Sequence, residues 1–273
     1  MDFTPYINDL EKRASASIKA EQGDYYGEDG LLVCGKCHTP KQTRVSFLGI
    51  EKTPMCLCKC AAEKKEREEL KRRIAENRRY CFPDAKLERW TFANDDGANK
   101  ELSEAMKKYA DNFEEFKKQG KGLLLYGDVG RGKTYAAACV ANAVLDKGYS
   151  VFMTDFVSIA SAASEEWNKQ AYYNSLNNFS LLIIDDLNAE RKTEYMQEIV
   201  KAVINTRYNA GLPIIITTNL TGEELQSPSD MDYKRIFSRL YEMCIPVKVE
   251  GKDRRAEILK ADAKPMKELL GLL

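Results

Sequence analysis

The chain has 273 residues, enough for one large domain and a smaller one, and its composition of 44% hydrophobic and 31% charged residues is that of an ordinary globular protein. Lys plus Arg equals Asp plus Glu at 42 each, which excludes an overall basic bias toward nucleic acid, so any DNA contact requires a local patch. No segment approaches 18 consecutive apolar residues and the first residues lack a signal-peptide pattern, which excludes a membrane partner and predicts a cytoplasmic protein.

The N-terminal region combines a short predicted helix with a cluster of cysteines. The segment "INDLEKRASASIKA" reads as the helix, and the loop "GDYYGEDG" follows it. Five of the eight cysteines then fall within residues 34–60, and "TRVSF" between them reads as a strand. In a cytoplasmic chain such a cluster binds metal more often than it forms disulfides.

The cysteine spacing predicts a zinc site. "CGKCH" supplies one C-x-x-C pair and "CLCKC" two overlapping C-x-C pairs, and such spacings present two sulfurs to one ion. Zinc needs four ligands, whereas five cysteines and the single histidine compete for them. Cys56 is the alternative fourth ligand, His38 is equally explained as a loop residue, and unligated buried cysteines are the other explanation. The predicted zinc ligands are Cys34, Cys37, Cys58 and Cys60.

A charged connector is predicted to separate two domains. Residues 61–80 read as a helix with Glu–Arg pairs at i, i+4 and few apolar side chains. Pro83 then interrupts the chain at the start of an irregular stretch. The predicted domains are therefore 1–80, with the cysteines and the connector, and 84–273.

The stretch "GDVGRGKTYAAACV", residues 127–140, predicts a phosphate-binding loop. It fits G-x-x-x-x-G-K-[ST], follows the apolar strand "GLLLY" and opens an alanine-rich helix. Lys133 would reach the β- and γ-phosphates of ATP, and the Thr134 hydroxyl would bind Mg²⁺. A turn that uses glycine for conformation alone would leave the Lys-Thr pair unexplained. The predicted nucleotide-binding residues are Gly127, Asp128, Val129, Gly130, Arg131, Gly132, Lys133, Thr134 and Tyr135.

Beyond residue 100, short apolar strands alternate with helices. The segments "YSVFMTD", "LLIIDD" and "PIIITTN" read as strands, with helices through "VSIASAASEEWNKQ" and "YMQEIVKAVINTRYN" between them. This alternation predicts an α/β domain, a parallel sheet with helices on both faces.

Polar residues at two strand ends complete the predicted catalytic set. Asp185 would hold Mg²⁺, and Asp186 lies where the attacking water must be oriented, although an acidic loop after a buried strand is the simpler alternative. Asn219 would help to orient the water, although Asn also ends strands for turn reasons. Arg235 and Arg239 lie four apart on a predicted helix, either as surface arginines or as a finger that reaches a neighbouring subunit's nucleotide.

Together, "GDVGRGKT", "LLIIDDL", "IIITTN" and "RIFSRL" resemble the AAA+ ATPases of the DnaC and DnaI group, the bacterial and phage helicase loaders. The likeness covers about residues 85–260. It implies an AAA+ P-loop NTPase fold in which Asn219 is sensor 1, Arg239 is the arginine finger, and either Arg254 or Arg255 is the second sensor. It also implies that residues 89–95 lead into the nucleotide domain near the adenine.

The resemblance implies a function as well as a fold. DnaI-like loaders carry a zinc-bearing N-terminal domain that binds the replicative helicase, so the resemblance implies a hexameric helicase as partner of residues 1–80. It also implies binding of single-stranded DNA and self-association through the ATPase domain. Many AAA+ proteins have Glu where this chain has Asp186, so slow ATP hydrolysis is expected. The alternatives are an IstB-like transposition helper ATPase and a nucleotide-bound adaptor in which Asp186 is inert.

Overall fold

The chain forms two compact units, residues Met1–Arg72 and Arg73–Leu273, in the computed structural model. The structure describes residues 19–47, 49–187, 193–227, 231–254 and 270. Most of the helix predicted from "INDLEKRASASIKA" lies outside these residues. The division falls inside helix α2, Lys59–Arg78, slightly before the boundary expected near Pro83.

The N-terminal unit is built from two short antiparallel ribbons. β1 (Tyr25–Tyr26) pairs with β2 (Leu32–Val33), and β3 (Val45–Phe47) pairs with β4 (Ile50–Lys52), so the strand expected at "TRVSF" forms at its C-terminal end. Its buried residues, within the part of the chain that the structure describes, are few: Leu32, Cys34, Lys41 and Cys58. A core of this size gives little hydrophobic stabilisation.

Helix α2 confirms the predicted charged helix. All of its 20 residues are described and none is buried. Its side chains are therefore solvated, and pairs such as Lys64 and Glu68, 3.9 Å apart at i, i+4, contribute only a few tenths of a kcal/mol each, on the order of 0.3–0.5.

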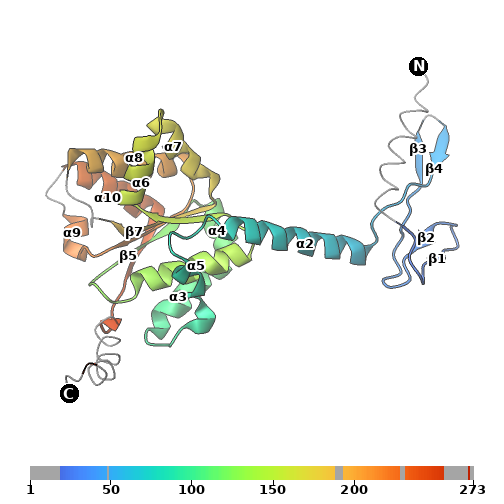
Figure 1. Ribbon diagram of the computed structural model, residues 1–273, viewed down its shortest axis with the longest axis horizontal. Helices are drawn as coiled ribbons and strands as arrows, with labels where there is room; N and C mark the ends of the chain where they lie inside the picture. The colour runs from blue at the N-terminus through green and yellow to red at the C-terminus, as the bar shows by residue number, and fades with distance from the viewer. Residues whose placement is uncertain (1–18, 48, 188–192, 228–230, 255–269, 271–273) are drawn as a thin grey trace. The chain divides into compact units, whose positions relative to one another are not determined.

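The C-terminal unit contains a five-stranded, fully parallel sheet in the order β6-β7-β8-β5-β9, which confirms the α/β prediction (Figure 1). The strand Cys244–Lys248 was not predicted because it contains Pro246 and has little apolar pattern. It forms at the edge of the sheet, where a proline is tolerated. The five strands are β5 (Gly122–Tyr126), β6 (Val151–Asp155), β7 (Leu181–Leu187), β8 (Ile214–Thr218) and β9 (Cys244–Lys248).

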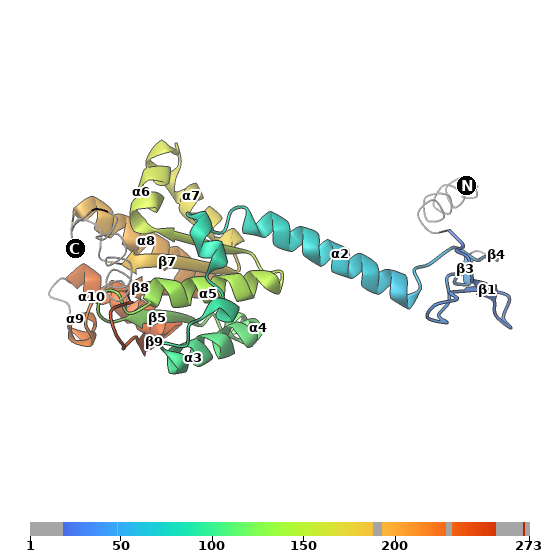
Figure 2. The ribbon, with the colours of Figure 1, turned by 60° about the horizontal axis from the view of Figure 1, so that its bottom comes forward.

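Helices cover both faces of the sheet, as Figures 1 and 2 show. Alternate residues of β7 enter opposite cores, Leu181 and Ile183 on one side and Leu182 and Ile184 on the other. One face carries α3 (Lys100–Asp111), α4 (Phe113–Lys118) and α5 (Lys133–Asp146). The other carries α6 (Phe156–Glu165), α7 (Lys169–Ser175), α8 (Glu194–Ala210), α9 (Gly222–Gln226) and α10 (Met231–Met243).

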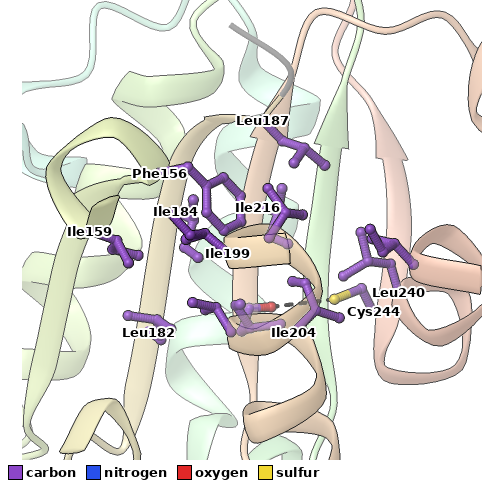
Figure 3. Close-up of a cluster of buried hydrophobic side chains, with 14 of the residues drawn as sticks. Phe156, Ile159, Leu182, Ile184, Leu187, Ile199, Ile204, Ile216, Leu240 and Cys244 are labelled. Atoms are coloured by element: carbon purple, nitrogen blue, oxygen red, sulfur yellow. Dashed lines mark hydrogen bonds between the residues drawn. The ribbon is translucent and has the colours of Figure 1, made fainter. Parts of the chain in front are cut away.

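The hydrophobic core on the face that carries α6 to α10 packs α6 and α8 against the sheet (Figure 3). Phe156 and Ile159 of α6 and Ile199 and Ile204 of α8 pack over Leu182 and neighbouring strand residues. Because the strands are parallel, their carboxyl ends share one edge, where the polar residues of β7 and β8 meet. The described residues of this unit also form three short 3₁₀ helices: η1 (Ala85–Arg89), η2 (Phe92–Asn94) and η3 (Leu176–Asn178).

Among the described residues, no helix combines the length and the apolar character that crossing a membrane requires.

Candidate nucleotide site and cysteine cluster

The predicted phosphate loop connects β5 to α5 with a backbone that requires glycine. Gly127 and Gly132 have φ angles of 134° and 91°, in the region that side chains rarely adopt. A Cβ at Gly127 would lie 2.7 Å from the Val249 carbonyl oxygen. The loop ends at Gly132, the N-cap of α5. The free N–H groups and the dipole at this helix N-terminus favour anions.

Lys133, the first residue of α5, folds back over this loop. Its side chain is buried, with 6% of the residue exposed, and Nζ donates to the carbonyl oxygens of Gly127 and Asp128 at 2.7 Å each. The ammonium group thus lies inside the loop, where it can exchange these carbonyls for phosphate oxygens. The prediction from the sequence motif fits this geometry.

The predicted magnesium ligands lie in contact. The Thr134 hydroxyl donates to Asp185 Oδ1 at 3.0 Å, although the two residues come from α5 and β7. Burial raises the pKa of Asp185, and hydrogen bonds from Thr217 and Thr134 oppose this rise. A hydroxyl and a carboxylate are oxygen donors of the kind Mg²⁺ prefers, so these residues fit the ion.

Asp186 lies in a β-bulge of β7, which sets the direction of its side chain. The register between β7 and β8 shifts between Ile184 and Leu187, and Asp186 adopts a φ of 62°, which is uncommon for a residue with a side chain. Its Oδ1 accepts a hydrogen bond from Asn219 Nδ2 at 2.7 Å. The predicted water-orienting carboxylate and the predicted sensor are therefore brought together.

Thr217 is a site residue that sequence reasoning missed. Its hydroxyl donates to Asp185 Oδ1 at 2.6 Å and accepts from the Asp186 backbone N–H at 2.8 Å, and only 1% of the residue is exposed. One hydroxyl thus holds the carboxylate of Asp185 and the backbone of Asp186 at the bulge. Which strands pair, and in what register, has no local sequence signature, so the partner of Asp185 on β8 could not be assigned from the strand pattern.

These groups surround a cavity of about 570 Å³. Trp90 and Tyr135 meet at one side with ring centroids 5.6 Å apart, and the Arg254 guanidinium lies 4.9 Å from the centre of the Tyr135 ring. The Arg254 side chain also donates to Asp96, and its backbone N–H donates to the Gly130 carbonyl at 3.0 Å. Of the two candidates for the second sensor, Arg254 lines the cavity and Arg255 lies outside the described residues.

The structure does not bring Arg239 to this cavity. Its side chain donates to Asn205 Oδ1 on α8, and its guanidinium lies 5.6 Å from the centre of the Tyr208 ring. Within the described part of the chain, Arg239 is therefore separate from the nucleotide site of its own subunit.

In the N-terminal unit, the four predicted zinc ligands form one cluster. The Sγ atoms of Cys34, Cys37, Cys58 and Cys60 lie within 4.8 Å of one another. Cys60 Sγ is 3.7 Å from Cys34 Sγ and 3.5 Å from Cys58 Sγ. Zn–S bonds of about 2.3 Å in a tetrahedron place sulfurs roughly 3.8 Å apart, whereas a disulfide is about 2.05 Å long. The four cysteines therefore fit zinc. None of the eight cysteines, all of which lie within the described residues, forms a disulfide.

The two competing ligands lie outside the cluster. Cys56 Sγ contacts the Pro40 carbonyl oxygen at 3.7 Å, and His38 Nδ1 is hydrogen-bonded to the Tyr25 hydroxyl at 3.1 Å. Neither belongs to the four-sulfur group.

A buried ion pair supports the first cysteine loop. Lys41 Nζ lies 2.6 Å from Asp24 Oδ2, and both side chains are almost fully buried. Asp24 Oδ1 accepts from the Gly35 N–H at 3.1 Å, between Cys34 and Cys37. The Lys41 hydrogen bond and the Glu21 N–H lower the pKa of Asp24 to about 2, so the pair is ionised at neutral pH.

Comparison with known proteins places this geometry in a family. A family profile described as IstB-like ATP binding protein matches residues 56–260. The chain belongs to the IstB-like ATP-binding family. This match covers α2 and nearly all of the nucleotide-binding unit.

The chain is also similar to curated proteins with a named role. The chain is 27% identical over 150 residues to the replicative helicase loader DnaI of Bacillus subtilis, covering 50% of this chain and 48% of that protein. It is 27% identical over 126 residues to the replicative helicase loader DnaC of Escherichia coli, covering 44% and 51%. The chain thus spans about half the length of these curated relatives.

The fold is also that of a solved loader. A crystal structure of the DnaC helicase loader superposes with a TM-score of 0.53 at 22% identity, covering 61% of this chain and 100% of that chain. This likeness confirms the AAA+ P-loop NTPase fold expected of this IstB-like chain.

Proposed function

We propose that this chain is an ATP-dependent loader of a replicative hexameric helicase that acts in DNA replication in the cytoplasm. The observation that carries the proposal is the four-sulfur cluster in a separate unit that precedes the nucleotide-binding unit. The names of the DnaI and DnaC relatives support the same role.

In this proposal the C-terminal unit binds and hydrolyses ATP. The phosphates bind at residues 127–134, where Lys133 neutralises the β- and γ-phosphates. Mg²⁺ at Thr134 and Asp185 supplies positive charge against the phosphate oxygens. Asp186, held by Asn219, accepts a hydrogen bond from the attacking water. Because the Asp186 side chain is one methylene shorter than that of Glu, ATP turnover is slow. In this proposal single-stranded DNA stimulates the turnover.

Two arginines have separate proposed roles. Arg254, beside Tyr135 in the cavity, senses nucleotide within its own subunit. Arg239 acts as the finger toward the nucleotide of a neighbouring copy, which accounts for its distance from its own cavity. This role requires that the chain associates with itself through its ATPase domain.

The N-terminal domain, residues 1–80 with the connector helix, is proposed to bind the helicase. Zinc held by the four sulfurs supplies the fold that the small core cannot supply alone. A transposition helper has no evident need for this module, which is why the loader is the better assignment for this member of the family.

Capture of a purified replicative helicase by two fragments distinguishes these functions. We expect residues 1–80 to retain the helicase in the presence of zinc and to lose it with chelator. Residues 84–273 should bind ATP without retaining the helicase, because they lack the cysteine cluster. Helicase that follows residues 84–273, or neither fragment, would favour the transposition helper. ATP binding without turnover, with or without single-stranded DNA, would favour the adaptor.

A further inference from the structure

Asn142 is a buried amide in an otherwise apolar helix. It lies on α5 among Ala141, Ala138 and other buried residues, and only 2% of it is exposed. Asn is a poorer helix former than Ala, and a buried amide costs free energy unless its groups are hydrogen-bonded. The hydrogen bonds of the Asn142 side chain must therefore account for an Asn at this buried position.

Those contacts converge on the segment that leads to the cavity. Asn142 Nδ2 lies 2.9 Å from the carbonyl oxygens of Leu87 and Trp90 and 3.1 Å from that of Ala138, so its two N–H groups serve three acceptors and one N–H is shared. Leu87 and Trp90 belong to the turn at the end of η1, and the Trp90 N–H itself donates to the Leu87 carbonyl at 3.1 Å. One amide thus ties this turn to the helix that begins at the phosphate loop.

Arg78 fixes the orientation of the amide. Its Nη1 donates to Asn142 Oδ1 at 2.6 Å, and its Nη2 forms an ion pair with Asp146 at 2.8 Å. A guanidinium is only a donor and a carbonyl is only an acceptor, so one orientation of the amide satisfies both sets of partners. The last residue of α2 therefore holds Asn142 with its N–H groups toward Trp90.

The turn matters because Trp90 lines the nucleotide cavity. Trp90 faces Tyr135, which lies two helical turns before Asn142 on α5, and the Tyr135 hydroxyl donates to the Thr91 carbonyl at 3.3 Å. Helix α5 thus holds the backbone at residues 90 and 91 at two successive carbonyls. These contacts fix the aromatic side of the cavity independently of the phosphate loop.

We propose that Asn142 is a positioning residue for the nucleotide base, acting through Trp90, and that Arg78 supports it. The inference rests on the proposed ATP binding and adds to it the group that sets affinity for the base rather than for the phosphates. The consequence is separable, because loss of Asn142 should weaken binding of ATP while binding of a ligand with phosphates alone is preserved.

The test compares ATP with inorganic tripolyphosphate, each with Mg²⁺, on the full chain. The chain has two tryptophans, and Trp167 is fully exposed, so a Trp167→Phe parent leaves Trp90 as the fluorescent reporter. In Asn142→Leu we expect ATP affinity to fall roughly three- to tenfold, the effect of losing about one or two net hydrogen bonds. Tripolyphosphate affinity should stay within about twofold of the parent, a change worth only about 0.4 kcal/mol. Acrylamide quenching of Trp90 in the free protein should increase.

Two further variants keep the result decisive if Asn142→Leu does not fold. Arg78→Met should also lower ATP affinity, but by a smaller factor, because it removes the donor to Asn142 Oδ1 and leaves the Asn142 amide in place. Asp146→Asn is the matched control, since it changes the other partner of Arg78 without touching Asn142, and it should bind ATP as the parent does. Unchanged ATP affinity, or an equal loss for ATP and tripolyphosphate, would overturn the proposal. A parent that binds neither ligand would instead refute the proposed ATP binding.

Discussion

Replacing Lys133 with alanine should reduce ATP affinity by roughly 100-fold or more. Hydrogen bonds to charged groups contribute about 1.5–3 kcal/mol each, and in the proposed ATP site Lys133 contacts both the β- and γ-phosphates. Each 1.4 kcal/mol corresponds to about tenfold in affinity, so losing two such bonds reaches this range. Equilibrium binding of ATP with Mg²⁺ measures the change.

Lys147→Ala is the matched control for this substitution. Lys147 lies just beyond the other end of α5, and its Nζ also donates to two backbone carbonyls, those of Ala110 and Asp111 at 2.7 and 2.8 Å. Removing it costs similar hydrogen bonds far from the cavity, so ATP affinity should be unchanged. Wild-type affinity in Lys133→Ala would refute the phosphate-loop assignment.

Replacing Cys34 and Cys37 together with serine should release zinc and unfold the N-terminal unit. The purified chain should carry about one zinc, and two ligands of four cannot hold a structural site. Structural zinc contributes on the order of 10 kcal/mol to folding in small domains, far more than the few buried side chains here can supply. Elemental analysis gives the zinc content, and hydrogen exchange of residues 19–58 reports the loss of structure.

Cys56→Ser provides the control for the zinc prediction. Its sulfur lies outside the four-sulfur cluster, so zinc content and protection from exchange should match the wild type. ATP binding should survive in both variants because the nucleotide site lies in the other unit. Freshly purified protein without metal, or zinc that depends on Cys56, would contradict the assignment.

The sequence predicted those parts of the site that depend on local chemistry. The glycines, Lys133 and Thr134 are specified by the conformation and charge that a phosphate loop requires. The choice of Cys58 and Cys60 over Cys56 also agrees with the cluster geometry. In each case the signal lies in residue type and spacing, which are fully visible in a sequence.

The contacts that depend on long-range packing were not predictable. Thr217 meets Asp185 because β7 and β8 pair in a register that sets the residues after Ile184 and Ile216 side by side. Asn142 meets Trp90 because residues 84–94 fold onto α5. An Asn among alanines shows no periodicity that reveals its partner. Edge strand β9 was missed for a similar reason, since its pairing with β5 compensates for a weak strand pattern.

The most direct test of the loader assignment is the amount of hexameric replicative helicase placed on closed circular single-stranded DNA. A circle has no free end for the helicase to thread, so placement requires a factor that opens or assembles the ring. We predict that helicase is recovered on the circles when this chain and ATP are both present, and that Lys133→Ala and the Cys34→Ser, Cys37→Ser variant each fail to support it. Recovery of the same amount of helicase with and without this chain would contradict the assignment.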